Sequence, residues 1–284
     1  MKKIIILAES GSDVNPQLAA QYDVAIIPMH VNFDDVSRDD GTFDPQEIVD
    51  FYRQTGKLPK TSASTPDDFM RMFDKLHTEH PDAHILYLAY SAVTTCTYAN
   101  AKIAAEDADY ITMLDTKLAS AGQGIVVMAV ADYVNNHPDA TIEEVVEVAN
   151  DYIARGNMCF LPDNLEFLRA GGRVSNVAYL GSRILNLHPC IEFVDGQLIA
   201  TKKYRGNMVK VAAKLVEDYS EKYNLDRSKI WFIHSVSLSE EVRQSAEQAA
   251  KEAGFEDFMW IRANGVITTH GGPAAFGMAG FSKK

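Results

Sequence analysis

The stretch Lys60-Thr61-Ser62-Ala63-Ser64-Thr65-Pro66-Asp67-Asp68-Phe69 joins a hydroxyl-rich segment directly to a helix start. Thr65 suits the N-cap position, Pro66 the first helical position and Asp68 the third. The free amide groups and the positive end of the helix dipole make such a junction a suitable seat for a small anionic group. Taken alone, the segment is more typical of a well-capped loop that binds nothing.

A second hydroxyl-rich loop follows the next predicted strand. Residues 84–90 form an apolar run, Ser91 to Thr97 form the loop, and an alanine-rich helix is predicted over 98–107. Open α/β sheets bind their ligands where a strand ends and a helix begins. Two hydroxyl loops in such positions favour a ligand site over two unrelated loops.

The rest of the chain alternates between predicted strands and helices, which is typical of an α/β fold. Pro28 argues for an edge position or a bulge in the strand predicted over 24–31. A hairpin is predicted around Asp195-Gly196. The other predicted strands are 3–8, 110–114, 157–161, 229–234, 258–262 and 266–273, the last running into a glycine-rich turn, and the other predicted helices include 122–133, 208–223 and 240–253. We expect two α/β domains, residues 1–157 and 158–284, that share a cleft.

Composition narrows the class of protein. A chain of 284 residues is about twice the usual domain size, and its net charge of −12 argues against nucleic acid or an anionic membrane surface as the main partner. Cys96, Cys159 and Cys190 show no metal-binding spacing, which suits a reducing cytoplasm. The first apolar run breaks at Glu9, and no run approaches the roughly 20 residues of a membrane span. We therefore expect a cytoplasmic protein without a membrane span. Peripheral contact with a membrane is compatible with these features.

Common catalytic motifs are absent from the sequence. It contains no phosphate-binding loop with its Gly-Lys-Ser/Thr, no dinucleotide fingerprint and no glycine-flanked serine, and no histidine pair has the spacing of a zinc helix. We therefore predict neither catalytic residues nor a metal. His270 precedes Gly271-Gly272-Pro273, where backbone could approach a ligand closely, although a lone histidine is more often structural. Arg169, Arg173, Lys202, Lys203 and Arg205 form either a solvated face or a surface for a phosphate or an acidic partner.

Several motifs together resemble the DegV family over nearly the whole chain. The matching segments are Glu9-Ser10-Gly11-Ser12-Asp13, Lys60-Thr61-Ser62, Ser91 to Tyr98, Leu165 to Leu168, Gly171-Gly172-Arg173-Val174-Ser175, Asp195-Gly196, Arg205-Gly206 and Thr268-Thr269-His270 with Gly272-Pro273. The family comprises bacterial fatty-acid-binding proteins that serve as the lipid-presenting subunit of fatty acid kinase. The resemblance implies two α/β domains with a long-chain fatty acid held between and inside them.

The resemblance also implies roles for individual residues. The fatty-acid carboxylate would be held by Thr61, Ser62, Ser91 and His270, with Thr95 as an additional hydroxyl. Arg169, Arg173 and Arg205 would meet the ATP-binding kinase subunit. The protein would be non-catalytic and need no cofactor apart from its fatty acid ligand.

This chain departs from the family pattern in its loops. The family usually has Ser-Ser-x-Leu-Ser-Gly-Thr where this chain has Ser91 to Thr97, so that Ala92 replaces a serine and Cys96 a glycine. Differences also occur at Glu9-Ser10-Gly11 and at Ala63-Ser64-Thr65. Two alternative functions stay open at this point: an acyl hydrolase that uses Ser91 and His270, and a regulatory protein that senses a lipid.

Overall fold

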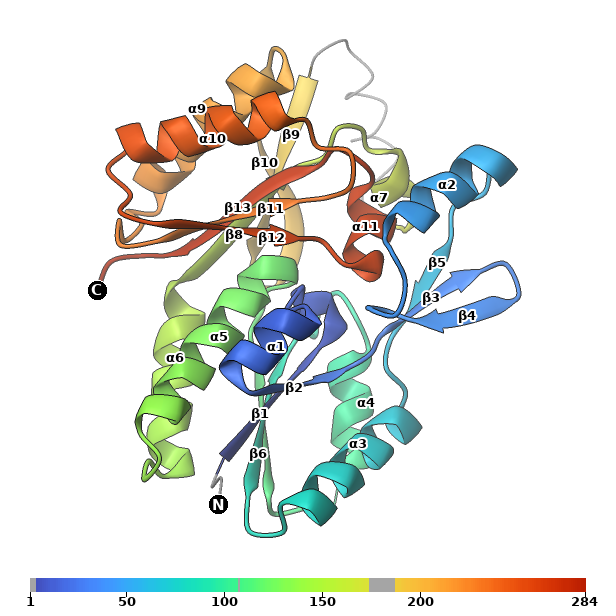
Figure 1. Cartoon of the computed structure of the whole chain (residues 1–284), viewed down its shortest axis with the longest axis vertical. Coiled ribbons are helices and arrows are strands. Elements are labelled where there is room, and N and C mark those ends of the chain that lie inside the picture. The colour runs from blue at the N-terminus through green and yellow to red at the C-terminus, as the bar shows by residue number, and fades with distance from the viewer. Residues whose placement is uncertain (1–3, 107, 174–186) are drawn as a thin grey trace.

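The computed structural model describes residues 4–106, 108–173 and 187–284, which form an α/β fold with two main sheets (Figure 1). The first sheet is parallel throughout, with the strand order β2-β1-β6-β7. Its strands are β1 (Ile4–Glu9), β2 (Val24–Ile27), β6 (His84–Ala89) and β7 (Ile111–Asp115). The 3-10 helix η1 (Ser10–Ser12) and helices α1 (Pro16–Tyr22), α3 (Pro66–Glu79) and α4 (Thr97–Ala104) connect or cover these strands. The predicted α/β class is confirmed.

The second sheet is mixed, with the strand order β10-β9-β8-β13-β11-β12. Its strands are β8 (Gly156–Leu161), β9 (Leu187–Val194), β10 (Gln197–Arg205), β11 (Ile230–His234), β12 (Phe258–Arg262) and β13 (Phe276–Phe281). Helices α9 (Met208–Lys222) and α10 (Glu240–Glu252) lie together over the outer face of this sheet (Figure 1). The predicted hairpin is present, because Asp195 and Gly196 adopt φ angles of 48° and 81° between β9 and β10.

A small third sheet corrects two predictions. The strand expected over 24–31 ends at Ile27, and after Pro28 the chain re-enters as β3 (His30–Phe33) in an antiparallel sheet of order β4-β3-β5. Proline breaks the strand because it has no amide hydrogen to donate. The first hydroxyl loop is also partly a strand, since β5 (Lys60–Ser62) pairs with β3. The remaining elements of this region are β4 (Val36–Asp39) and α2 (Gln46–Thr55).

One helix occupies the space between the two main sheets. Helix α5 (Ser120–Asn136) has apolar residues on all sides, and one core cluster joins it to β1 and β6 on one side and to β11 and β13 on the other. A helix that is apolar all round is typical of such a buried position. Helix α6 (Ile142–Arg155) packs against it and leads into β8. Since α5 packs against both sheets, the proposed domain boundary at residue 157 stays a prediction.

The C-terminal segment differs most from its prediction. Residues expected to be a strand form helix α11 (Gly265–Gly271), and a central strand of the second sheet, β13, follows it without having been predicted. The β-branched run Val266 to Thr269 favours a strand locally. The helix forms because the carboxylate of Asp40 accepts hydrogen bonds from its first two amides, at Gly265 and Val266. Helix α7 (Glu166–Ala170) packs beside α11. Across the described ranges of the chain, no helix is long and apolar enough to cross a membrane.

Candidate functional site

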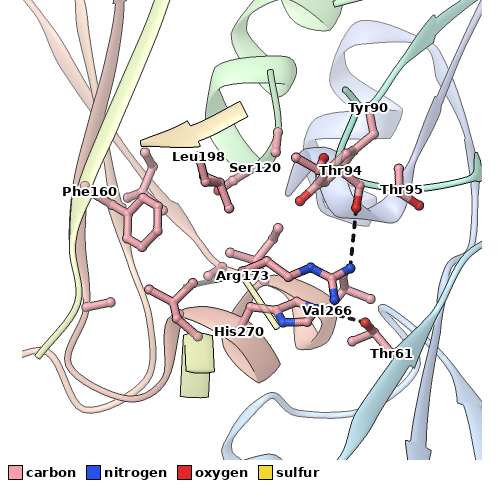
Figure 2. Close-up of a pocket in the computed structure, with 18 of the residues that line it drawn as sticks. Thr61, Tyr90, Thr94, Thr95, Ser120, Phe160, Arg173, Leu198, Val266 and His270 are labelled. Atoms are coloured by element: carbon pink, nitrogen blue, oxygen red, sulfur yellow. Dashed lines mark hydrogen bonds between the residues drawn. The ribbon is translucent and has the colours of Figure 1, made fainter. Parts of the chain in front are cut away.

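A cavity of about 410 Å³ lies where the second sheet and α11 meet the hydroxyl segments of the first half of the chain. Its volume falls within the range of about 300–1,000 Å³ that is usual for small-molecule sites. Apolar side chains from β8, β9, β10, β11, β13 and α7 form most of its wall (Figure 2). These apolar residues include Met158, Phe160, Leu168, Phe193, Leu198, Ile233 and Phe276. The cavity therefore suits a long apolar group.

Polar groups gather at one part of this cavity. Thr61 Oγ1 and His270 Nε2 lie 2.9 Å apart, and Ser62 and Thr95 line the same cavity. Thr61 comes from β5 and His270 from α11, as Figure 2 shows. Four of the five residues predicted to hold a carboxylate are thus brought to one cavity.

The imidazole of His270 is neutral at physiological pH. Burial lowers its pKa from 6.5 to about 3, and the positive charge of Arg173 adds to the effect. Its Nδ1 atom is buried and has no hydrogen-bond partner in the described part of the chain. When Nε2 carries the proton and donates it to Thr61 Oγ1, the hydroxyl hydrogen of Thr61 is free to donate to an anion. His270 can therefore orient Thr61 as a hydrogen-bond donor to a ligand.

The Gly-Gly-Arg segment fixes the position of His270. A Cβ atom added at Gly171 would collide with Nδ1 and Cε1 of the imidazole. Any side chain larger than that of glycine would therefore displace His270 or the end of α7. Gly172 adopts φ +72°, a left-handed conformation that glycine favours. The Gly-Gly-Arg motif noted in the sequence therefore packs against the imidazole of His270.

Arg173 lines the cavity, whereas the sequence pointed to a position facing a partner. Its guanidinium group donates hydrogen bonds to the carbonyl oxygens of Gly171 and Thr94, the latter at 3.4 Å (Figure 2). Among the residues that the structure describes, no carboxylate pairs with it. An anionic ligand in the cavity would complement this charge. Because the side chain is also exposed, a partner contact stays a prediction.

Ser91 is placed differently from its prediction. It is fully buried and does not line the cavity, and its hydroxyl donates a 2.7 Å hydrogen bond to the carbonyl oxygen of Gly196. Gly196 belongs to the turn between β9 and β10, so that Ser91 ties the second hydroxyl loop to this hairpin. A direct contact between Ser91 and the carboxylate stays a prediction, and this placement does not favour it.

The other two arginines lie outside the cavity lining. Arg169 is in the last turn of α7 and Arg205 ends β10, and both side chains are exposed. Their assignment to a partner surface is compatible with these positions and stays a prediction.

The sequence did not indicate Tyr90 and Ser120 as cavity residues. Tyr90 lines the cavity and directly follows β6. Its amide donates hydrogen bonds of 3.1 and 3.2 Å to the buried carboxylate of Glu9. Burial raises the pKa of the Tyr90 hydroxyl, so that it stays protonated. Ser120 begins α5 and donates a hydrogen bond to Asp13. The only sequence signal for either was its position after a strand or before a helix.

Comparison with known proteins identifies the family. A family model described as "Uncharacterised protein, DegV family" matches residues 3–283. The chain belongs to the DegV family. This DegV protein is 30% identical over 290 aligned positions to a "Fatty acid-binding protein" of Thermotoga maritima, covering 97% of this chain and 96% of the relative.

Solved structures of DegV proteins share the fold. A structure described as "Fatty Acid Binding of a DegV family Protein from Thermus thermophilus" superposes with a TM-score of 0.87 at 26% identity, over 100% of both chains. A second, the Streptococcus pneumoniae Fatty Acid Kinase B3 protein loaded with linoleic acid, has a TM-score of 0.84 at 18% identity, over 99% of this chain and 100% of its own. At 18% identity, the similarity to the Streptococcus pneumoniae protein supports the fold alone.

The described part of the chain contains no group of three or more His, Cys, Asp or Glu side chains arranged to hold a metal ion. The cavity contains hydroxyls, one neutral imidazole and one guanidinium group. These groups suit the binding of a carboxylate.

Proposed function

We propose that this DegV protein binds a long-chain fatty acid in the cavity between its sheets, with the carboxylate at Thr61, Ser62, Thr95, His270 and Arg173. The observation that carries the proposal is the joining of an apolar cavity to the Thr61 and His270 pair, next to a guanidinium group without a carboxylate partner among the described residues. The relatives described as fatty-acid-binding proteins support it.

The energetics favour an apolar ligand with a weakly held head group. Each buried methylene contributes about 0.8 kcal/mol, so that a chain of about 16 carbons supplies on the order of 10 kcal/mol before entropy costs. The carboxylate then needs only enough hydrogen bonds to offset its loss of water. Charge-assisted bonds from Thr61 and Arg173 meet that need.

We further propose that the protein presents this carboxylate to a separate ATP-dependent kinase subunit. A carboxylate oxygen would attack the γ-phosphorus of ATP, the bond to the β-phosphate oxygen would break, and acyl phosphate and ADP would result. The exposed side chains of Arg169, Arg173 and Arg205 are candidates for contact with the kinase subunit. In this proposal the protein holds the acceptor and the partner supplies the nucleotide and the chemistry. Residues 1–157 and 158–284 would act as the two domains that enclose the ligand.

The hydrolase alternative lacks its nucleophile in this geometry. Ser91 Oγ is buried, donates to the carbonyl oxygen of Gly196, and does not line the cavity that His270 lines. A serine nucleophile needs a base within hydrogen-bond reach. The lipid-sensing alternative would use the same cavity. A pull-down distinguishes it from the kinase proposal, because it identifies the protein that binds only when lipid is present.

Mass spectrometry of the purified protein tests the binding proposal. We expect one fatty acid per chain in the native spectrum and the same acid in a solvent extract. A protein that is empty and takes up no added fatty acid would contradict it. The kinase step is tested separately by adding a purified DegV-partner kinase with ATP and measuring acyl phosphate.

A further inference from the structure

Helix α11 carries His270, yet its beginning is held by the first half of the chain. Asp13 Oδ1 accepts a 2.8 Å hydrogen bond from the amide of Asn264, and Asp40 Oδ1 accepts bonds of 2.7 and 3.2 Å from the amides of Gly265 and Val266. The first amides of a helix have no partner within the helix and need acceptors from elsewhere. Two side chains that lie more than 220 residues earlier supply them here.

The carboxyl groups of these two residues are deeply buried. Asp13 is 0% and Asp40 4% exposed. Burial raises the pKa of both groups, that of Asp13 to about 8, and the hydrogen bonds from the amides of Asn264, Gly265 and Val266 act in the opposite direction. Buried carboxylates are costly unless they are hydrogen-bonded. Their position therefore depends on α11 as much as α11 depends on them.

The contact between Asp40 and α11 leaves no free space. A Cβ atom added at Gly265 would lie 2.9 Å from Asp40 Oδ1 and 2.6 Å from Phe43 Cζ. The backbone of Asp40 is fixed in turn, because its amide donates a 2.8 Å bond to the carbonyl oxygen of Met29. Only glycine at position 265 lets the carboxylate approach the helix this closely.

Helix α11 is short, so that a constraint on its first residues also constrains His270 near its other end. His270 follows Gly265 by five positions, a distance of about 8 Å along a helix axis. Thr269 Oγ1 donates a 2.8 Å bond back to the carbonyl oxygen of Gly265, which ties the two ends together. A shift at the first amides therefore displaces the imidazole relative to Thr61, which lies on β5.

We infer that Asp40 and Asp13 are positioning residues for carboxylate recognition: they fix the beginning of α11 so that His270 meets Thr61. Neither residue lines the cavity, so that neither contacts the ligand. The inference rests on the proposed function, since it assigns a role to the site that binds the fatty acid head group. It predicts that loss of either cap lowers the affinity for a carboxylate ligand more than the affinity for an uncharged ligand of the same chain length, although Val266 and Ile267 of α11 also line the cavity.

The test compares palmitate with 1-hexadecanol, which has the same chain length and no charge. In Asp40→Leu, a substitution that keeps the branched shape of the side chain and removes the hydrogen-bond acceptor, we expect the preference for palmitate over hexadecanol to fall about tenfold, the value typical of one hydrogen bond to a charged group. Gly265→Ala should give the same change from the opposite side of the contact. Asn207→Ala is the matched control, since Asn207 caps α9 through a 3.0 Å bond to the Lys210 amide, away from the cavity.

A second readout separates positioning from stability. In the wild type we expect the NMR signals of His270 to report a neutral imidazole well below pH 6.5, because burial lowers its pKa to about 3, whereas in Asp40→Leu the imidazole should become solvated and titrate near the usual pKa of 6.5. If Asp40→Leu and Gly265→Ala lower the melting temperature but leave the palmitate preference and the His270 signals unchanged, the inference is wrong. If the wild type itself binds neither palmitate nor hexadecanol, the proposed fatty acid binding is wrong. This result differs from the one that contradicts the inference, in which the wild type binds lipid and the variants keep its palmitate preference.

Discussion

Thr61 and His270 lie 209 positions apart in the sequence and are joined by a 2.9 Å contact between Oγ1 and Nε2. The contact links the small β4-β3-β5 sheet to α11. It forms the polar part of a cavity whose other walls are largely apolar. The function proposed for this protein depends on the chemistry of that pair.

Replacement of Thr61 by valine keeps the shape of the side chain and removes its hydroxyl. We expect Thr61→Val to weaken fatty acid binding by about 1.5–3 kcal/mol, because a hydrogen bond to the charged carboxylate is lost. Binding of the corresponding methyl ester, which carries no charge, should change much less. Isothermal titration with both ligands measures the difference. Thr55→Val on the exposed surface of α2 is the control, and an equal loss for acid and ester would contradict the prediction.

Gly171→Ala should displace His270 without changing any polar group. The added Cβ atom collides with the imidazole, so that both the Thr61 contact and the affinity for the carboxylate should decrease. Ala170→Ser, in the neighbouring exposed position, should have little effect. In a His270→Ala background the collision is absent, and Gly171→Ala should then cost much less, which a double-mutant cycle measures. Additive effects of the two substitutions would rule out this contact as the cause.

The buried carboxyl group of Asp13 should make the protein less stable as the pH rises. Its pKa is raised from 3.8 to about 8 in the folded state, so the folded state binds more protons than the unfolded state between these values. The contribution of Asp13 to the free energy of unfolding is therefore full below about pH 4 and is lost as the pH rises through 8. In Asp13→Asn this loss should be absent. Urea unfolding of both proteins between pH 5 and 9 tests this, and parallel curves would contradict it.

The ionisation of His270 changes the free energy of unfolding with pH in the opposite direction to that of Asp13. Its pKa is lowered from 6.5 to about 3, so that the unfolded state binds more protons between these values. This group stabilises the protein fully above about pH 6.5, and its contribution is lost as the pH falls toward 3. The pH dependence of Asp13→Asn should therefore retain a decline in stability on the acid side, which His270→Gln removes.

Filling the cavity should shorten the ligand that it accepts. Ala275 lines the cavity and is 8% exposed. Ala275→Leu adds three carbon atoms, and we expect the longest fatty acid that binds well to lose about three methylenes, each worth about 0.8 kcal/mol. Ala20→Leu on the exposed side of α1 is the control. A series of saturated acids from 10 to 20 carbons gives the measurement, and an unchanged optimum would place the alkyl chain elsewhere.

Local sequence signals predicted the alternating strands and helices of the first sheet and the hydroxyl segments, since each of these depends on a short stretch of chain. The parts that could not be predicted depend on distant partners. The segment Val266 to Thr269 has strand propensity and becomes a helix because Asp40, 225 positions earlier, caps it. Ser91 has the local setting of a ligand residue but donates to the carbonyl oxygen of Gly196, 105 positions away. The orientation of Arg173 into the cavity likewise follows from its contact with Thr94.

The most direct test of the account is native mass spectrometry of the purified protein, followed by solvent extraction and identification of any lipid. The account predicts one long-chain fatty acid per folded chain, and less of it in Thr61→Val than in the wild type. A wild-type protein that is folded, empty and unable to take up added palmitate would contradict the central claim.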